Sequence, residues 1–124
     1  MSDDRILLHG LSYFGYHGVQ ADERRHGQRF LVDVELTVDT RGAGTSDDLG
    51  VTVDYAAVER DIRAIVEGPP CNLIEAVAER IASTILAGYQ TSAVLVRVRK
   101  PDVPMPATLD AVGVEIVRRR EARG

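Results

Sequence analysis

The 124 residues are 44% hydrophobic and 27% charged, which is typical of one ordered globular domain and excludes a disordered or fibrous chain. Acidic residues outnumber basic ones by 19 to 15, and the net charge of −4 argues against a nucleic-acid partner. A single cysteine excludes an internal disulfide, and because no apolar run is long enough for a signal peptide or a membrane span, we expect a cytoplasmic protein without a membrane partner.

The first part of the chain predicts two strands. Residues 5–14 are mostly apolar and compatible with a strand, and Gly15 ends the run. Over residues 32–39, apolar and polar side chains alternate with a period of two, as in a strand with one buried and one wet face. Residues 41–48 have the composition of an irregular loop.

Two helices are predicted next. Apolar residues recur at helical spacing in the first, which ends before Gly68 and two prolines; they are Val58, Ile62, Ile65 and Val66. The second covers residues 73–87, with an apolar stripe formed by Ile74, Val77, Ala78, Ile81 and Ile85. Gly88 suits the left-handed position after a helix end.

Two more alternating segments, residues 93–100 and 111–118, predict the last strands. The order ββααββ indicates an α+β fold in a single domain over residues 1–124, with its core at about 5–118. The sheet would be four-stranded and antiparallel, with two helices on one face and a polar opposite face. A ring of subunits that closes the sheets into a barrel would remove the exposed edges.

The sequence contains four arginines after the last alternation of apolar and polar residues, which we interpret as a solvated tail without function: Arg118, Arg119, Arg120 and Arg123.

The common motifs of cofactor-binding and hydrolytic sites are missing from the sequence, namely glycine-rich phosphate loops, dinucleotide fingerprints, zinc-protease motifs and nucleophile elbows. The three histidines and one cysteine are scattered, so we expect neither a metal nor a cofactor.

A few charged and hydroxyl residues could carry chemistry. Lys100 ends a strand before a proline-rich loop, where it is either an edge-protecting charge or an amine held for proton transfer. Glu75 follows Asn72 by three residues, so it could complete a helix capping box or could bind a ligand through two parallel N–H donors.

Three further residues have a structural and a functional interpretation. Tyr55 suits a core-facing aromatic or a phenol held as donor or acceptor, and Asp54 is most simply a helix N-cap. The segment from Gly15 to Gly18 predicts a tight turn whose glycines permit positive φ, and Glu23 beyond it would ordinarily be a surface charge.

Taken together, residues 5–118 resemble the dihydroneopterin aldolase family in the order and spacing of their motifs. These motifs are Phe14-Gly15-Tyr16-His17-Gly18 with Glu23, Gly27-Gln28-Arg29-Phe30, Ser46-Asp47-Asp48, Thr52-Val53-Asp54-Tyr55, Asn72-Leu73-Ile74-Glu75, and Lys100-Pro101 with Pro104-Met105-Pro106. Asp54 stands where some relatives carry histidine, and Ala107-Thr108 replaces a commoner glycine-containing turn.

The resemblance implies the tunnelling fold, in which ββααββ subunits form a homo-oligomeric ring with a central barrel, two rings stack into an octamer, and pterin sites lie between subunits. It also implies roles. Glu75 would hold the pterin edge with Ile74 nearby, Lys100, Tyr55 and Glu23 would act in catalysis, and Val53, Asp54 and Tyr55 would come from the neighbouring subunit.

The implied reaction is metal-independent retro-aldol cleavage of 7,8-dihydroneopterin in folate biosynthesis, with 2′-epimerisation as a side activity. Two alternatives stay open: a dihydroneopterin triphosphate epimerase, for which the site loops lack extra positive charge, and a pterin-binding ring without catalysis. Zinc-dependent relatives need a His and Cys set that His9, His17, His26 and Cys71 do not readily provide.

Overall fold

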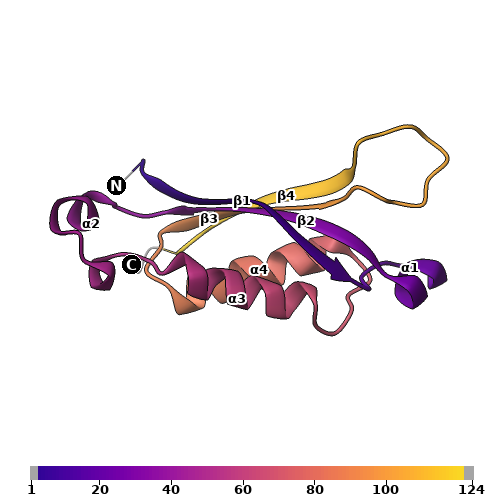
Figure 1. Ribbon diagram of the computed structural model, residues 1–124, viewed down its shortest axis with the longest axis horizontal. Coiled ribbons are helices and arrows are strands. Elements are labelled where there is room, and N and C mark those ends of the chain that lie inside the picture. Colours follow the sequence, from indigo (N-terminus) through magenta and orange to yellow (C-terminus); the bar gives the residue numbers. More distant parts are fainter. Residues whose placement is uncertain (1–2, 122–124) are drawn as a thin grey trace.

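The computed structural model describes residues 3–121, which form a sheet with two long helices packed beneath it (Figure 1). The main elements follow the predicted ββααββ order, namely β1 (Arg5–Gly15), β2 (Gln28–Thr37), α3 (Tyr55–Val66), α4 (Ile74–Gly88), β3 (Ala93–Lys100) and β4 (Val112–Arg119). The α+β class and the four-stranded antiparallel sheet are confirmed. No helix within residues 3–121 is long and apolar enough to cross a membrane.

The sheet order is β1-β2-β3-β4, so β1 and β4 form its two edges. Each strand runs antiparallel to its neighbour, and the register pairs Val32 with Val98 and Val34 with Val96 across the central strands. All four of these valines are buried. The period-two pattern therefore predicted correctly which side chains face the helices.

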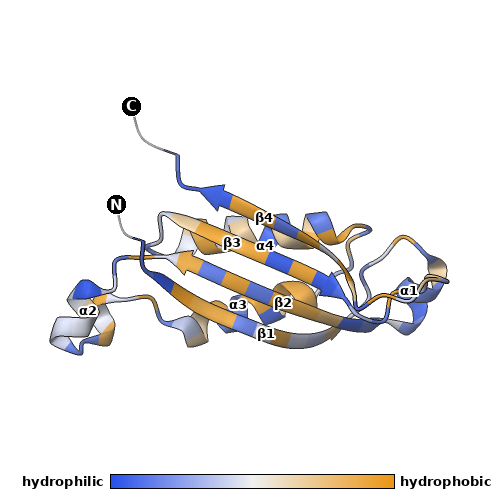
Figure 2. Ribbon diagram, turned by 90° about the horizontal axis from the view of Figure 1, so that it is seen from above, coloured by the Kyte–Doolittle hydropathy of each residue, from blue (hydrophilic) through white to orange (hydrophobic). Residues whose placement is uncertain are grey.

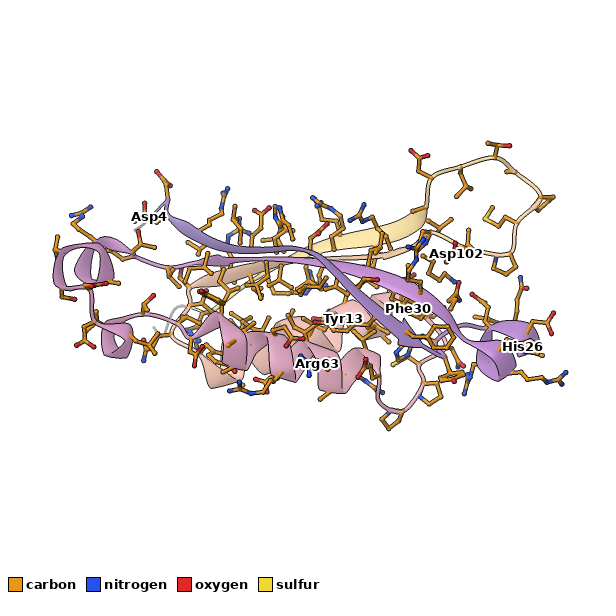
Figure 3. All side chains as sticks on the ribbon, viewed as in Figure 1. Asp4, Tyr13, His26, Phe30, Arg63 and Asp102 are labelled. Atoms are coloured by element: carbon orange, nitrogen blue, oxygen red, sulfur yellow. The ribbon has the colours of Figure 1, made fainter. Side chains whose placement is uncertain are left out.

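The core lies between the sheet and the two long helices. Figure 3 shows Tyr13 and Phe30 in this layer, and Phe30 is fully buried. The helices contribute the residues that their apolar spacing predicted, including Val58, Ile62 and Val66 of α3. Burial of these apolar side chains is the main force that holds the helices, of 12 and 15 residues, to the sheet.

The opposite face of the sheet is free of helices and carries alternating polar positions (Figure 2). Asp33 lies on this face and is nevertheless 4% exposed, because Arg97 and Arg99 each donate a hydrogen bond of 3.0 Å to its Oδ2. The N–H of Gly10, at a bulge in β1, donates to its Oδ1 at 2.6 Å. Asp33 therefore links three strands of the sheet.

Two short helices were not predicted. Helix α1 (Ala21–His26) extends beyond one end of the sheet, and α2 (Arg41–Ser46), followed by the 3-10 turn η1 (Leu49–Val51), lies at the other end. The prediction of an irregular loop over 41–48 is therefore wrong. The left-handed conformation predicted for Gly88 is also wrong, because Gly88 is the last residue of α4 and the chain leaves the helix in an extended conformation at Tyr89.

The C-terminal arginines are not a solvated tail, so that interpretation is corrected. Arg118 and Arg119 belong to β4, and Arg118 forms an ion pair with Glu79 of α4 at 2.8 Å. Arg120 donates to the carbonyl oxygens of Leu86 at 2.5 Å, Tyr89 at 2.9 Å and Thr91 at 3.1 Å, which lie at and just beyond the C-terminal end of α4. Arg123 lies outside the described residues.

Candidate active site

A buried ion pair joins α1 to the end of β3. The Nζ of Lys100 lies 2.8 Å from Oε2 of Glu23, and the two side chains are 14% and 6% exposed. Lys100 is the last residue of β3 and Glu23 lies in the first turn of α1, so the pair closes one end of the molecule. Glu23 is therefore not the surface charge that its position suggested, and Lys100 has lost most of its contact with water.

Other donors complete the surroundings of the Glu23 carboxylate. Nε2 of Gln28 donates to Oε2 at 2.7 Å, and the backbone N–H of Gln20 donates to Oε1 at 3.3 Å. Burial alone would raise the pKa of Glu23, but the hydrogen bonds from Lys100, Gln28 and Gln20 hold this pKa below its usual value. The carboxylate therefore stays ionised and fixes the direction of the Lys100 ammonium group.

Glycine is required at two positions that bring the loop after β1 to this pair. A Cβ on Gly18 would lie 2.5 Å from the carboxyl carbon of Glu23, and Gly18 has a φ of +151°. A Cβ on Gly15 would lie 2.6 Å from the carbonyl oxygen of Val66 at the end of α3. Gly18 adopts the positive φ that the sequence permits, whereas Gly15 does not, and close backbone approach is the reason for glycine at that position.

The same loop is attached to the turn that leads into α4. The ring of His17 accepts a hydrogen bond from the N–H of Cys71 at Nδ1, 2.9 Å away, and its Nε2 lies 2.7 Å from the carbonyl oxygen of Val66. The N–H of Gly18 donates to the carbonyl oxygen of Cys71 at 2.9 Å. The loop that leads from β1 to α1 is therefore joined directly to the turn before Ile74.

Glu75 lies in the first turn of α4, and Lys100 is the last residue of β3. The start of α4 and the end of β3 lie at the same end of the molecule (Figure 1). The capping box with Asn72 does not form, because the helix begins after Leu73 and Asn72 Oδ1 instead accepts from Arg24 at 2.6 Å. The Glu75 carboxylate is exposed and makes no hydrogen bond or ion pair with other residues of the described part, 3–121. Ile74 beside it is 6% exposed.

The remaining predicted site residues lie at the far end. Asp54 caps α3 as predicted, with Oδ1 accepting from the N–H of Ala56 at 3.0 Å. Val53 is buried, whereas Tyr55 is 64% exposed and does not face the core. Helix α3 has 12 residues and is therefore about 18 Å long, and its other end contacts His17. Tyr55 and Lys100 cannot meet within one chain.

Lys100 lines neither of two cavities found among residues 3–121. A cavity of about 1070 Å³ lies at the opposite end of the sheet, with Arg5, Thr91 and Arg119 among its lining residues. A second, of about 590 Å³, lies beside Gln28, between Phe14 and Asp102. No group of three or more His, Cys, Asp or Glu side chains that could hold a metal ion occurs within residues 3–121.

These groups define the chemistry available at the Lys100 end. The ion pair can move a proton at the Lys100 amine, and the unpaired Glu75 carboxylate can accept two N–H donors from a planar ligand. Gln28 and His17 are parts of the site that the sequence alone did not single out. Both occur within the quoted motifs, but a glutamine at the start of a strand and a histidine between glycines carry no distinctive signal.

Comparison with known proteins places the whole chain beside one family. The family model described as dihydroneopterin aldolase matches residues 6–117. The dihydroneopterin aldolase of Streptomyces coelicolor is 48% identical over 117 residues, which cover 94% of this chain and 98% of the relative. That of Bacillus subtilis is 42% identical over 118 residues, covering 94% and 98% of the two chains.

Solved structures agree with the sequence relatives. The E. coli dihydroneopterin aldolase, determined in complex with neopterin, superposes with a TM-score of 0.86 at 32% identity, covering 93% of this chain and 98% of that one. A Vibrio cholerae protein described as a putative dihydroneopterin aldolase gives a TM-score of 0.89, also at 32% identity, over 97% of this chain and 100% of that one.

Proposed function

The chain belongs to the dihydroneopterin aldolase family, and we propose that it is a carbon–carbon lyase that cleaves 7,8-dihydroneopterin into 6-hydroxymethyl-7,8-dihydropterin and glycolaldehyde. The observation that carries the proposal is the buried Lys100–Glu23 pair at the same end of the fold as the unpaired Glu75 carboxylate. A proton-transfer group and a pterin-binding group are the two functions that this reaction asks of a protein.

Binding is assigned to Glu75. The 2-amino group and N3–H of a pterin present two parallel donors, which one carboxylate accepts together. Because no protein group within residues 3–121 occupies Glu75, its acceptors are free for such a ligand. Ile74, one residue earlier, supplies an apolar contact for the ring.

The chemistry needs only proton movement, because the N5=C6 imine of the dihydropterin accepts the electron pair. Removal of the proton from the 2′-hydroxyl breaks the C1′–C2′ bond, releases glycolaldehyde and leaves an enamine. Protonation at C1′ then gives the product. Lys100 and Tyr55 are proposed as the acid–base groups, acting directly or through water, and Glu23 orients the Lys100 amine.

The complete site is proposed to need a second subunit. Tyr55 lies with Val53 and Asp54 at the start of α3, a helix about 18 Å long whose other end contacts the loop before Glu23, so a neighbouring chain would supply these three residues. The edge strands β1 and β4 are the surfaces through which copies would pair into a ring. Two such rings would stack into an octamer with pterin sites between subunits.

The test is to incubate the purified chain with 7,8-dihydroneopterin and to measure glycolaldehyde and 6-hydroxymethyl-7,8-dihydropterin. Exhaustive chelation should leave the rate unchanged, and loss of activity that zinc restores would contradict the metal-independent mechanism. Binding of neopterin without cleavage would instead indicate a non-catalytic pterin-binding protein. Epimerisation of the triphosphate without cleavage would indicate the epimerase.

A further inference from the structure

His17 is a fully buried polar side chain to which the proposed mechanism gives no role. Its two ring nitrogens both have partners, since Nδ1 faces the N–H of Cys71 at 2.9 Å and Nε2 faces the carbonyl oxygen of Val66 at 2.7 Å. A backbone N–H can only donate and a carbonyl can only accept, so the ring is neutral and carries its proton on Nε2. Its edge packs against Phe30, with ring centroids 5.2 Å apart.

The Nδ1 side of the His17 ring binds the turn that leads into the first turn of α4, where Glu75 lies. Cys71 is held through both backbone groups, because its N–H donates to His17 and its carbonyl oxygen accepts from Gly18 at 2.9 Å. Three residues separate Cys71 from Glu75, and Asn72 among them is bound by Arg24. The position of the first turn of α4 therefore depends on the loop that contains His17.

The other side of the ring leads to the ion pair. Glu23 follows His17 by six residues, and Gln28, which binds the Glu23 carboxylate at 2.7 Å, also lies 3.4 Å from the carbonyl oxygen of His17. Gly18 packs directly on Glu23. The buried His17 ring thus lies between the Lys100–Glu23 ion pair and the turn that leads to Glu75.

We infer that His17 is a positioning residue, which sets the separation between the Lys100–Glu23 pair and Glu75 by fixing Cys71 to the loop after β1. The inference rests on the proposed function, because it concerns the geometry of that site. A shift of about 1 Å between a binding group and a reacting group can lower a rate by roughly 10²-fold.

The environment keeps the ring in its neutral form. Burial lowers the pKa of His17, and the positive charges of Arg80 on α4 and Arg24 on α1 act in the same direction, whereas the hydrogen bond to Val66 opposes them. Protonation of Nδ1 would also set two donors against each other at Cys71. The contact with Cys71 is therefore present at neutral pH.

The experiment compares three variants with the wild type. His17→Phe replaces the imidazole with an aromatic ring that can still contact Phe30 but makes neither hydrogen bond, and His17→Asn keeps an acceptor that can reach Cys71. Tyr13→Phe is the matched control, because it removes one partly buried hydrogen bond, from Tyr13 of β1 to Glu59 of α3 at 2.8 Å, and this bond does not involve Cys71. Each variant is assayed well below its own unfolding temperature.

We expect His17→Phe to lower kcat/KM by roughly 10²-fold, with both kcat and KM affected, since the two groups lose their alignment. His17→Asn should recover most of the loss, and Tyr13→Phe should keep the kinetic constants of the wild type despite a lower stability. A folded His17→Phe with wild-type kcat and KM would overturn the inference. If that variant does not fold, His17→Asn is compared with His17→Gln, which can reach Val66 only; equal rates for the two would overturn it as well.

The positioning role of His17 can also be tested if the protein has no aldolase activity. If the wild type does not cleave dihydroneopterin, neopterin affinity by calorimetry and hydrogen exchange at the Cys71 amide still test the positioning role. The exchange should be slow in the wild type and in His17→Asn and fast in His17→Phe. Neopterin should bind tightly to the first two and more weakly to His17→Phe. Unchanged exchange and affinity in His17→Phe would contradict the inference without reference to turnover.

Discussion

Lys100 and Glu75 lie at the same end of the molecule but in different states. Lys100, the only lysine in the chain, is held by an ion pair, whereas the Glu75 carboxylate has no protein partner within residues 3–121. Substitution of each should therefore affect a different step of the reaction.

Glu75→Ala should mainly weaken pterin binding. It leaves two ring donors unpaired, which costs about 1–3 kcal/mol, or roughly 5-fold to 150-fold in the dissociation constant. Equilibrium binding of neopterin measures the effect, and single-turnover cleavage at saturating substrate should change less. A large fall in the single-turnover rate with unchanged binding would remove Glu75 from the binding role.

Lys100→Ala should chiefly lower kcat, by roughly 10²-fold or more, because a general acid–base group is lost. Lys100→Arg is the matched control, since a guanidinium keeps the charge beside Glu23 but does not release its proton. It should fold like the wild type and remain slow. If Lys100→Ala cleaves dihydroneopterin at the wild-type rate, the proton-transfer role is wrong and Lys100 has only the structural role of pairing with Glu23. The alternative interpretation as an edge-protecting charge is already excluded, because β3 is a central strand.

The ion pair also predicts a pH dependence of stability. Because the folded state lowers the pKa of Glu23, this carboxylate stabilises the fold above its unfolded value of 4.5, and the contribution is lost as the pH falls through the lower folded pKa. The difference in free energy of unfolding between the wild type and Glu23→Gln should therefore shrink from pH 6 towards pH 3. Denaturant unfolding at a series of pH values measures it, and a constant difference would contradict the assigned pairing.

At the scale of elements, periodicity predicted the long helices and the strands because each has an apolar stripe of sufficient length. Helix α1 has six residues, of which Ala21 alone is apolar, and α2 contains two glycines, so neither shows a helical pattern. The start of α4 was predicted correctly to within one residue, at Leu73. The capping box between Asn72 and Glu75 does not form, because the side chain of Asn72 accepts a hydrogen bond from Arg24 instead. The candidate site residues were proposed from the family motifs, whereas the hydrogen bonds of His17 join it to Val66 and Cys71, which lie 49 and 54 residues further along the chain.

Arg120 stabilises the end of α4 although it lies 32 residues beyond Gly88. Its guanidinium donates to three carbonyl oxygens near the negative end of the helix dipole. Arg120→Ala should therefore lower the free energy of unfolding by about 1–2 kcal/mol, as measured by urea titration. Arg120→Lys should recover only part of it, because an ammonium group cannot reproduce the planar fork. Equal urea midpoints of unfolding for Arg120→Ala and the wild type would show that these hydrogen bonds make no net contribution to stability.

At the scale of the whole molecule, the separation of Tyr55 from Lys100 predicts complementation between inactive chains. Tyr55→Phe and Lys100→Ala should each be slow alone, yet a mixed ring contains sites with Lys100 from one chain and Tyr55 from its neighbour. Random assembly of equal amounts should make about a quarter of the sites intact. Sedimentation of the wild type should show an oligomer. A fully active monomer, or refolded mixtures without recovered activity, would contradict a shared site.

The sheet order also has a consequence for folding kinetics. The β1–β2 and β3–β4 pairs join segments that are close in sequence, whereas the β2–β3 pair spans both long helices. Closing that long loop carries the largest entropic cost among the strand pairings, so we expect it to come late in folding. The contact between Glu23 and Lys100 spans the same interval of the chain. The Lys100–Glu23 ion pair is therefore assembled at the end of folding, and a chain arrested before this step would lack the site.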